Sequence, residues 1–363
     1  MTLIQPGIAI HKQIKKTLNG LSSSVSSLRS LFGGVGKRRL ILMFGFLILF
    51  NGLVWLIIFF ANKHYPLIFP LASLAFGLGL RHAVDADHIA AIDNTTRKLV
   101  HEGKEATAVG LFFSLGHSAV VIILSLLIVL FAKFLQTRIP VWQHYGSIIG
   151  ALVSALFLLL IGFINLYYLR GTIQEWRDLK ISQGASNTLS PAKGFITRLL
   201  MPFIKLVTKS WHMFFVGFLF GLGFDTATEV GLLGISATTA ASGVPIGYVL
   251  LLPLAFACGM TIIDTLNGVL MLGAYGWANF TPSRKIYYNL YITGISIIIA
   301  LLIGSLELLQ VISKQFQLQG PFWGLVNTTV LTNLGYIIVA IFVASWLIAA
   351  GVYGAPRASP WYP

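Results

Sequence analysis

Arg81-His-Ala-Val-Asp-Ala-Asp-His-Ile-Ala-Ala-Ile-Asp93 follows directly on the apolar run from Leu67 to Leu80. Six of its thirteen side chains can ionise. An ionisable side chain at the centre of a bilayer costs about 2.5–3.5 kcal/mol on insertion scales, so such a residue needs a partner, water or a bound ion. We therefore expect other parts of the chain to supply those partners.

The composition is that of a membrane protein. Of 363 residues, 56% are hydrophobic and 10% are charged, whereas soluble domains have about 25% charged residues. Apolar runs long enough for a helix to cross a bilayer recur along the chain. The sequence predicts an all-α polytopic membrane protein of eight transmembrane helices at 39–61, 67–93, 107–132, 145–169, 212–240, 246–275, 286–311 and 325–352.

The positive charge is distributed unevenly between the two sides of the predicted membrane. With the boundary residue Arg39 counted, twenty Lys and Arg residues share the side of both termini, and four lie opposite. Cytoplasmic loops carry such an excess, so we expect both termini in the cytoplasm and the chain in the plasma membrane. The positive residues behind the net charge of +14 are then expected to set the orientation in the membrane and to contact anionic lipid headgroups. No nucleic-acid partner is expected.

This topology divides the chain into five parts. A basic cytoplasmic segment (1–38) precedes helices one to four (39–169), and a cytoplasmic loop (170–211) separates these from helices five to eight (212–352). A cytoplasmic tail (353–363) completes the chain.

The opening stretch has the residue types of a metal site. On a regular helix, at about 100° per residue, His82, Asp85 and His88 share one face, while Asp87 points nearly opposite to Asp85. Either the helix is distorted here or Asp87 acts on a neighbour of the ion. Imidazole and carboxylate together suit nickel, cobalt, zinc or copper. The candidate metal ligands are His82, Asp85, Asp87, His88 and, from the third span, His117.

Other spans carry polar residues at overlapping depths, between the middle of the membrane and its cytoplasmic half, as judged from about 1.5 Å of rise per residue. Arg81 is expected to neutralise Asp85 or Asp225. Asp225, Glu229 and Asp264 are expected either as further ligands or as a proton path. The set expected in the transport pathway, or orienting the ligands, is Arg81, Ser114, Asp225, Thr226, Glu229, Asp264, Thr265 and Asn267. The hydroxyls of Ser118, Thr228 and Thr261 could also orient ligands through hydrogen bonds.

The tetrapeptide Phe-Gly-Leu-Gly occurs at 76–79 and again at 220–223, each time just before the charged part of a span. The second and fifth spans cross the membrane in opposite directions. An inverted repeat of spans 2–3 and 5–6 is therefore a hypothesis, and such repeats are common in transporters, with the site at the repeat interface.

Four segments together carry a resemblance to a known family. The segment Arg81-His-Ala-Val-Asp-Ala-Asp-His-Ile89 resembles the His-x4-Asp-His signature of the nickel/cobalt transporter family of eight-span permeases. Segments 111–118, 222–229 and 259–265 resemble its other signatures, in the same order. One position departs from the pattern, because Asn267 stands where the family commonly has Asp. An amide brings no negative charge, so a carboxylate ligand is not expected there.

The resemblance implies uptake of Ni²⁺, Co²⁺ or both by a single-component secondary permease, with no catalytic residues, no cofactor and no ATPase subunit. Its partners are then a divalent metal ion and the lipid bilayer. One alternative is a nickel/cobalt efflux permease, although the loop 170–211 lacks the His-rich composition common in that branch. A second is an intramembrane metalloenzyme, for which the H-E-x-x-H pattern is missing from the sequence.

Overall fold

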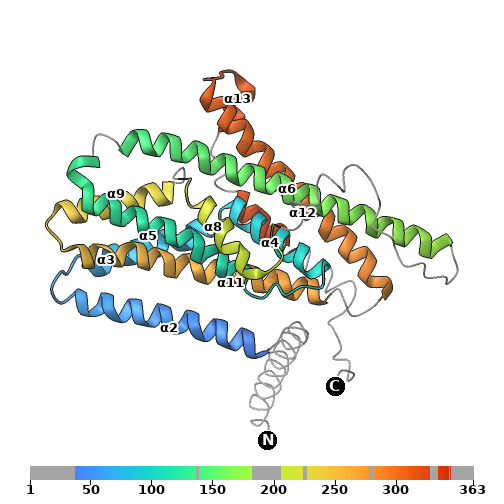
Figure 1. Cartoon of the computed structure of the whole chain (residues 1–363), viewed down its shortest axis with the longest axis horizontal. Coiled ribbons are helices and arrows are strands. Elements are labelled where there is room, and N and C mark those ends of the chain that lie inside the picture. The colour runs from blue at the N-terminus through green and yellow to red at the C-terminus, as the bar shows by residue number, and fades with distance from the viewer. Residues whose placement is uncertain are drawn as a thin grey trace, which may run out of the picture.

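The computed structural model describes residues 37–135, 139–181, 206–223, 227–277, 282–327, 334–342 and 344. Within these ranges the regular elements are all helices, and most of them run side by side along the long axis (Figure 1). Five helical segments are long and apolar enough to cross a membrane: 38–61, 109–130, 145–171, 246–273 and 293–315. These helices confirm the prediction of an all-α polytopic membrane protein.

The helices are α2 (Lys37–Ala61), α3 (Ile68–His82), α4 (Ala86–His101), α5 (Val109–Leu135), α6 (Ile139–Ile181), α8 (Met213–Phe220), α9 (Ala227–Ala241), α10 (Ile246–Val249), α11 (Leu251–Trp277), α12 (Pro282–Gln315) and α13 (Pro321–Asn327), with a short 3₁₀ turn, η1 (Ser210–His212). α6 therefore continues twelve residues into the segment 170–211 that was predicted to be a cytoplasmic loop. Residues 1–36 and 345–363, with most of the loop, lie outside the described ranges.

The second predicted span, 67–93, is interrupted and is not one continuous helix. α3 ends at His82, and α4 begins at Ala86. Between them, Val84 and Asp85 donate backbone hydrogen bonds only three residues back, and Asp85 then adopts an extended backbone with ψ of 146°. The alternative of a distorted helix is the one that the structure supports.

α4 continues past Asp93, so residues 94–101 are helical and not part of a loop as predicted. No Gly or Pro lies between Ala86 and His101. The helix ends where Gly103 takes a positive φ of 66°. The amide of Gly103 bonds to the carbonyl of Val100, and that of Lys104 to Leu99, the pattern that commonly closes a helix at a glycine.

The fifth predicted span is interrupted as well. α8 ends at Phe220, just before Gly221-Leu-Gly223, and α9 begins at Ala227. Residues 224–226 lie outside the described ranges. Two of the spans that contribute polar residues are thus built from paired shorter helices, an arrangement that transporters use where backbone lines a binding site.

A cluster of charges joins the end of α4 to α6. The Glu102 carboxylate accepts hydrogen bonds from Lys104 Nζ (2.6 Å) and the Tyr168 hydroxyl (2.8 Å), with Lys98 Nζ at 3.5 Å. Burial raises the pKa of Glu102, but these hydrogen bonds and the charge of Lys98 outweigh burial and lower the pKa below its ordinary value. Because the folded-state pKa is depressed, the cluster stabilises the fold at neutral pH and loses that contribution as pH falls through it.

Close approach of α3 to α11 requires glycine at position 79. A Cβ there would overlap the Phe256 backbone carbonyl, whereas a Cβ at Gly77 would have nothing within 4 Å. We expect Gly79→Ala to lower the melting temperature of the detergent-solubilised protein, because over-packing costs about 1–3 kcal/mol. Gly77→Ala is the matched control and should be neutral or slightly stabilising, since Ala favours a helix over Gly by about 0.5–1 kcal/mol. Equal melting temperatures for the two variants would contradict the close packing.

Candidate metal centre

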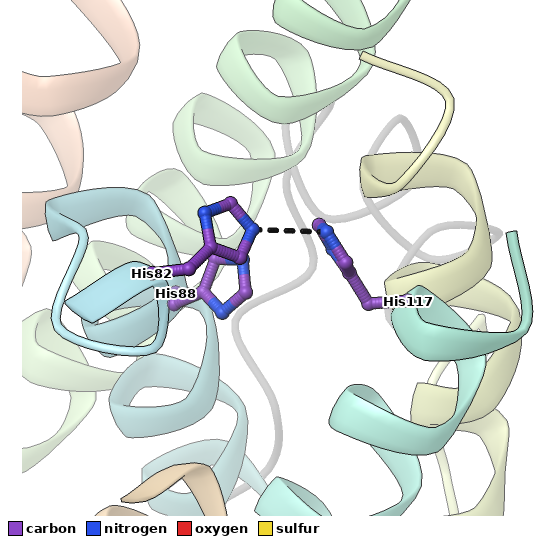
Figure 2. A group of neighbouring side chains, drawn as sticks. All are labelled: His82, His88 and His117. Atoms are coloured by element: carbon purple, nitrogen blue, oxygen red, sulfur yellow. Dashed lines mark hydrogen bonds between the residues drawn. The ribbon is translucent and has the colours of Figure 1, made fainter. Parts of the chain in front are cut away.

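Three buried histidines meet between α3, α4 and α5. His82 closes α3, His88 lies in the first turn of α4, and His117 lies in α5. Each side chain is at most 3% exposed. One ligand nitrogen from each lies within 4.8 Å of the other two, and Figure 2 shows the rings of His82 and His117 turned toward each other.

Glu229 of α9 completes this group. The two Nε2 atoms of His82 and His117 are 3.0 Å apart, and Glu229 Oε1 lies 2.8 Å from His117 Nε2 and 3.7 Å from His82 Nε2. Ligand atoms in neighbouring positions around an ion, at bonds of about 2.1 Å, lie about 3 Å apart. The separations within this trio therefore match those between neighbouring ligands of one ion.

His82 is oriented from its other ring nitrogen. Nδ1 lies 3.2 Å from Asp85 Oδ2 and 3.1 Å from the Thr228 hydroxyl. Asp85 is in turn ion-paired with Arg81, one helical turn earlier. A carboxylate at Nδ1 holds the proton there and leaves Nε2 free to bind a metal, as is usual for metal-binding histidines.

His88 faces a buried carboxylate. Its Nδ1 lies 3.4 Å from Asp264 Oδ2 of α11, and Asp264 is fully buried. Among the described residues, neither ring nitrogen of His88 nor either oxygen of Asp264 has a hydrogen-bond partner. Buried polar groups rarely stay unsatisfied without a reason, such as an ion that the group binds.

The other predicted site residues are placed differently. The half-buried Asp87 carboxylate accepts a hydrogen bond from the His88 backbone N–H (2.9 Å), at the N-terminal end of α4, where a negative charge is stabilised. Ser114 donates to the Leu111 carbonyl (3.0 Å). Thr265 and Asn267 lie on α11, each with a buried polar atom lacking a hydrogen-bond partner in the described structure. Asp225 and Thr226 fall outside the described residues.

Thr228 was considered from the sequence only as one of several hydroxyls that could orient a ligand, and its hydroxyl lies 3.1 Å from His82 Nδ1. Its contact with His82 joins α9 to α3 across 146 residues of sequence.

The fold and site define a multi-pass membrane protein that encloses a buried cluster of imidazole and carboxylate groups. The family of high-affinity nickel-transport proteins matches residues 68–352. The chain therefore belongs to that family, which confirms the family prediction. The family consists of transport proteins, so the prediction that the chain is a transporter and not an enzyme is also confirmed.

Individual relatives align with this chain along most of their length. The high-affinity nickel transport protein of Cupriavidus necator is 45% identical over 331 residues, which cover 89% of this chain and 94% of the relative. The nickel transporter NixA of Staphylococcus aureus is 44% identical, covering 81% and 88%. The cobalt transport protein NhlF of Rhodococcus rhodochrous is 36% identical, covering 75% and 79%. No solved structure matches the chain.

Proposed function

We propose that the chain takes up Ni²⁺, Co²⁺ or both across the plasma membrane as a single-component secondary permease. The observation that carries this proposal is the cluster of three buried histidines with ligand nitrogens within 4.8 Å of one another. Neutral imidazole suits nickel and cobalt among the divalent ions. Family membership and relatives named for nickel and cobalt transport support the same substrate.

The proposed ligands are His82 Nε2, His117 Nε2 and Glu229 Oε1, with His88 as the fourth. Asp85 orients His82, and Arg81 holds Asp85 in place. Asp264 is proposed to orient His88, as Asp85 orients His82. Asp87 is proposed to stabilise the first turn of α4 and to add negative charge near the ion, without binding it. The transported ion is the substrate, and neither a cofactor nor an ATPase subunit forms part of the proposal.

We also propose eight spans, with α3–α4 and α8–α9 as the interrupted second and fifth spans. The eighth span, predicted for 325–352, is only partly described: α13 ends at Asn327, and residues 334–342 are helical. Both termini and the segment 170–211 are placed in the cytoplasm because of the excess of Lys and Arg on that side. Helices one to four (39–169) and five to eight (212–352) then form the two halves.

An inverted repeat of spans 2–3 and 5–6 is proposed from two pairs of segments. Phe-Gly-Leu-Gly recurs at 220–223, and Gly116-His-Ser resembles Gly259-Met-Thr at the same spacing to within one residue. The packing is also reciprocal. α3 approaches α11 closely at Gly79 and Gly259, and α8 approaches α5 closely at Gly217 and Gly116. Superposing the two pairs of spans would show no two-fold relation if the proposal is wrong.

The function is tested by measuring accumulation of radioactive nickel and cobalt in cells that lack their own high-affinity uptake. Cells that make the chain are expected to accumulate more metal than cells carrying the empty vector, and each metal should compete with the other. The efflux alternative predicts the opposite sign, with less metal in the cells that make the chain. Equal accumulation in both strains would contradict transport in either direction.

A further inference from the structure

Residues 93–98 of α4 are polar on all sides of the helix and yet buried on all sides. The six consecutive residues 93–98 are Asp, Asn, Thr, Thr, Arg and Lys, and each is at most 7% exposed. At about 100° per residue, six residues cover the whole circumference of a helix. A helix that is polar all round is normally in contact with water. Here it is enclosed by α5, α6, α11 and α12.

One face of this segment is bonded to its neighbours. Arg97 donates to the hydroxyls of Thr293 (2.5 Å) and Ser296 (2.8 Å) of α12. Asn165 of α6 donates to the side chain of Asn94 (2.8 Å). These hydrogen bonds attach α4 to α6 and α12, so we expect the three helices to move together.

The face toward α11 is different. His88 lies opposite Asp264, and one turn later Ile92 lies against Gly268. A Gly268 Cβ would stand 3.5 Å from Ile92 Cγ2 and 3.1 Å from the backbone nitrogen of Gly110 on α5. Thr95 shares the face of His88, seven residues and about 10 Å further along α4. The Thr95 and Thr96 hydroxyls are buried and have no hydrogen-bond partner among the described residues. A buried hydroxyl without a hydrogen-bond partner destabilises the closed arrangement, and water in an open route would supply the missing partner.

We infer that the seam between α4 and α11 is the route by which the metal ion leaves toward the cytoplasm, closed in this structure by Ile92 against Gly268. Thr95 and Thr96 line the hydrated route when the seam opens. This inference rests on the proposed function and its orientation in the membrane. It adds an exit path to the binding site, with α11 separating from the unit formed by α4, α6 and α12.

Cysteine accessibility tests the route directly. Cys258 is the only cysteine, so Cys258→Ala gives a background for Thr95→Cys and for Leu158→Cys, an equally buried apolar control on α6. A charged, membrane-impermeant thiosulfonate is applied to inside-out vesicles supplied with Co²⁺ or with Mg²⁺. We expect Thr95→Cys to react at least about tenfold faster than Leu158→Cys, a difference of about 1.4 kcal/mol in accessibility, and faster with Co²⁺ than with Mg²⁺. Reaction at the Leu158→Cys rate under both conditions would overturn the route.

A cross-link provides an independent test that does not depend on Thr95 or Thr96. Ile92→Cys with Gly268→Cys, in the Cys258→Ala background, joins α4 to α11. Oxidation with diamide is expected to stop radioactive nickel uptake, and a reductant should restore it. The matched pair Asn94→Cys with Asn165→Cys joins α4 to α6. Nickel uptake by this variant should be the same whether its disulfide is formed by diamide or broken by the reductant.

The two tests separate the exit route from the proposed function. Unaltered uptake by the oxidised Ile92–Gly268 pair, with the disulfide verified, would overturn the route while leaving metal transport intact. Absence of uptake by the unmodified chain would instead overturn the proposed function. The thiosulfonate experiment measures access to the seam between α4 and α11 without any measurement of uptake.

Discussion

Cells that make His82→Ala or His88→Ala are expected to accumulate no more radioactive nickel than cells carrying the empty vector. Removing a group that merely orients a metal ligand already costs about 10–100-fold in affinity or activity, so removing a ligand should cost more. The two residues belong to different helices, α3 and α4, yet both changes should give the same loss because both nitrogens face one cluster.

The matched control is His64→Ala, because His64 is an exposed residue between α2 and α3. Its uptake should equal that of the unchanged chain. The amount of each variant in the membrane is measured by immunoblot, so that a folding defect is distinguished from a transport defect. Normal accumulation by either His82→Ala or His88→Ala, at normal abundance, would contradict the proposed site.

Glu229→Gln is expected to raise the KM for nickel at least about tenfold, with the amount of protein unchanged. The substitution keeps the size of the side chain but removes the negative charge, and Glu229 is 1% exposed in the centre of the cluster. An ion bound by neutral imidazoles and one carboxylate loses its only directly bound negative charge without that carboxylate. Glu229→Asp keeps the charge but withdraws the oxygen, so it should fall between Glu229→Gln and the unchanged chain.

Glu105→Gln serves as the control for charge alone. Glu105 is ion-paired with Arg39, and its side chain is 48% exposed, so neutralising it should leave the KM unchanged. Absorption of Co²⁺ bound to the purified protein gives a second readout, because loss of a ligand changes the coordination spectrum. An unchanged KM and an unchanged spectrum in Glu229→Gln would exclude Glu229 from the ligand set.

The sequence was sufficient to predict the membrane class and most of the helices, because apolar length alone decides whether a helix can span a bilayer. The interruption at Ala83–Asp85 could not be located in this way. Neither Gly nor Pro lies there, and His82 at the break contacts residues of α5 and α9 that are distant in the sequence. The burial of Thr95 and Thr96 was missed for a similar reason, since polar residues after an apolar span are normally in a loop.

The sequence named most residues of the candidate site but not how their side chains are arranged. His82, His88 and His117 are brought together, as their depths along the spans suggested. Asp87 was the residue that a straight helix could not direct toward the ion, and in the structure it bonds to backbone at the start of α4. Glu229 and Thr228 were named from the sequence, but their close contacts with His82 and His117 could not be predicted, because these depend on where α9 begins after an interruption in the fifth predicted span.

The break between α3 and α4 has a mechanical consequence. His82 and His88 are only six residues apart, but they belong to two helices, α3 and α4, joined by three non-helical residues. His117 and Glu229 lie on two further helices, α5 and α9. A bound ion would cross-link four separate helices at one point. Releasing the ion then means uncoupling those helices, so the affinity of the site and the resistance of the protein to rearrangement would be set by the same few bonds.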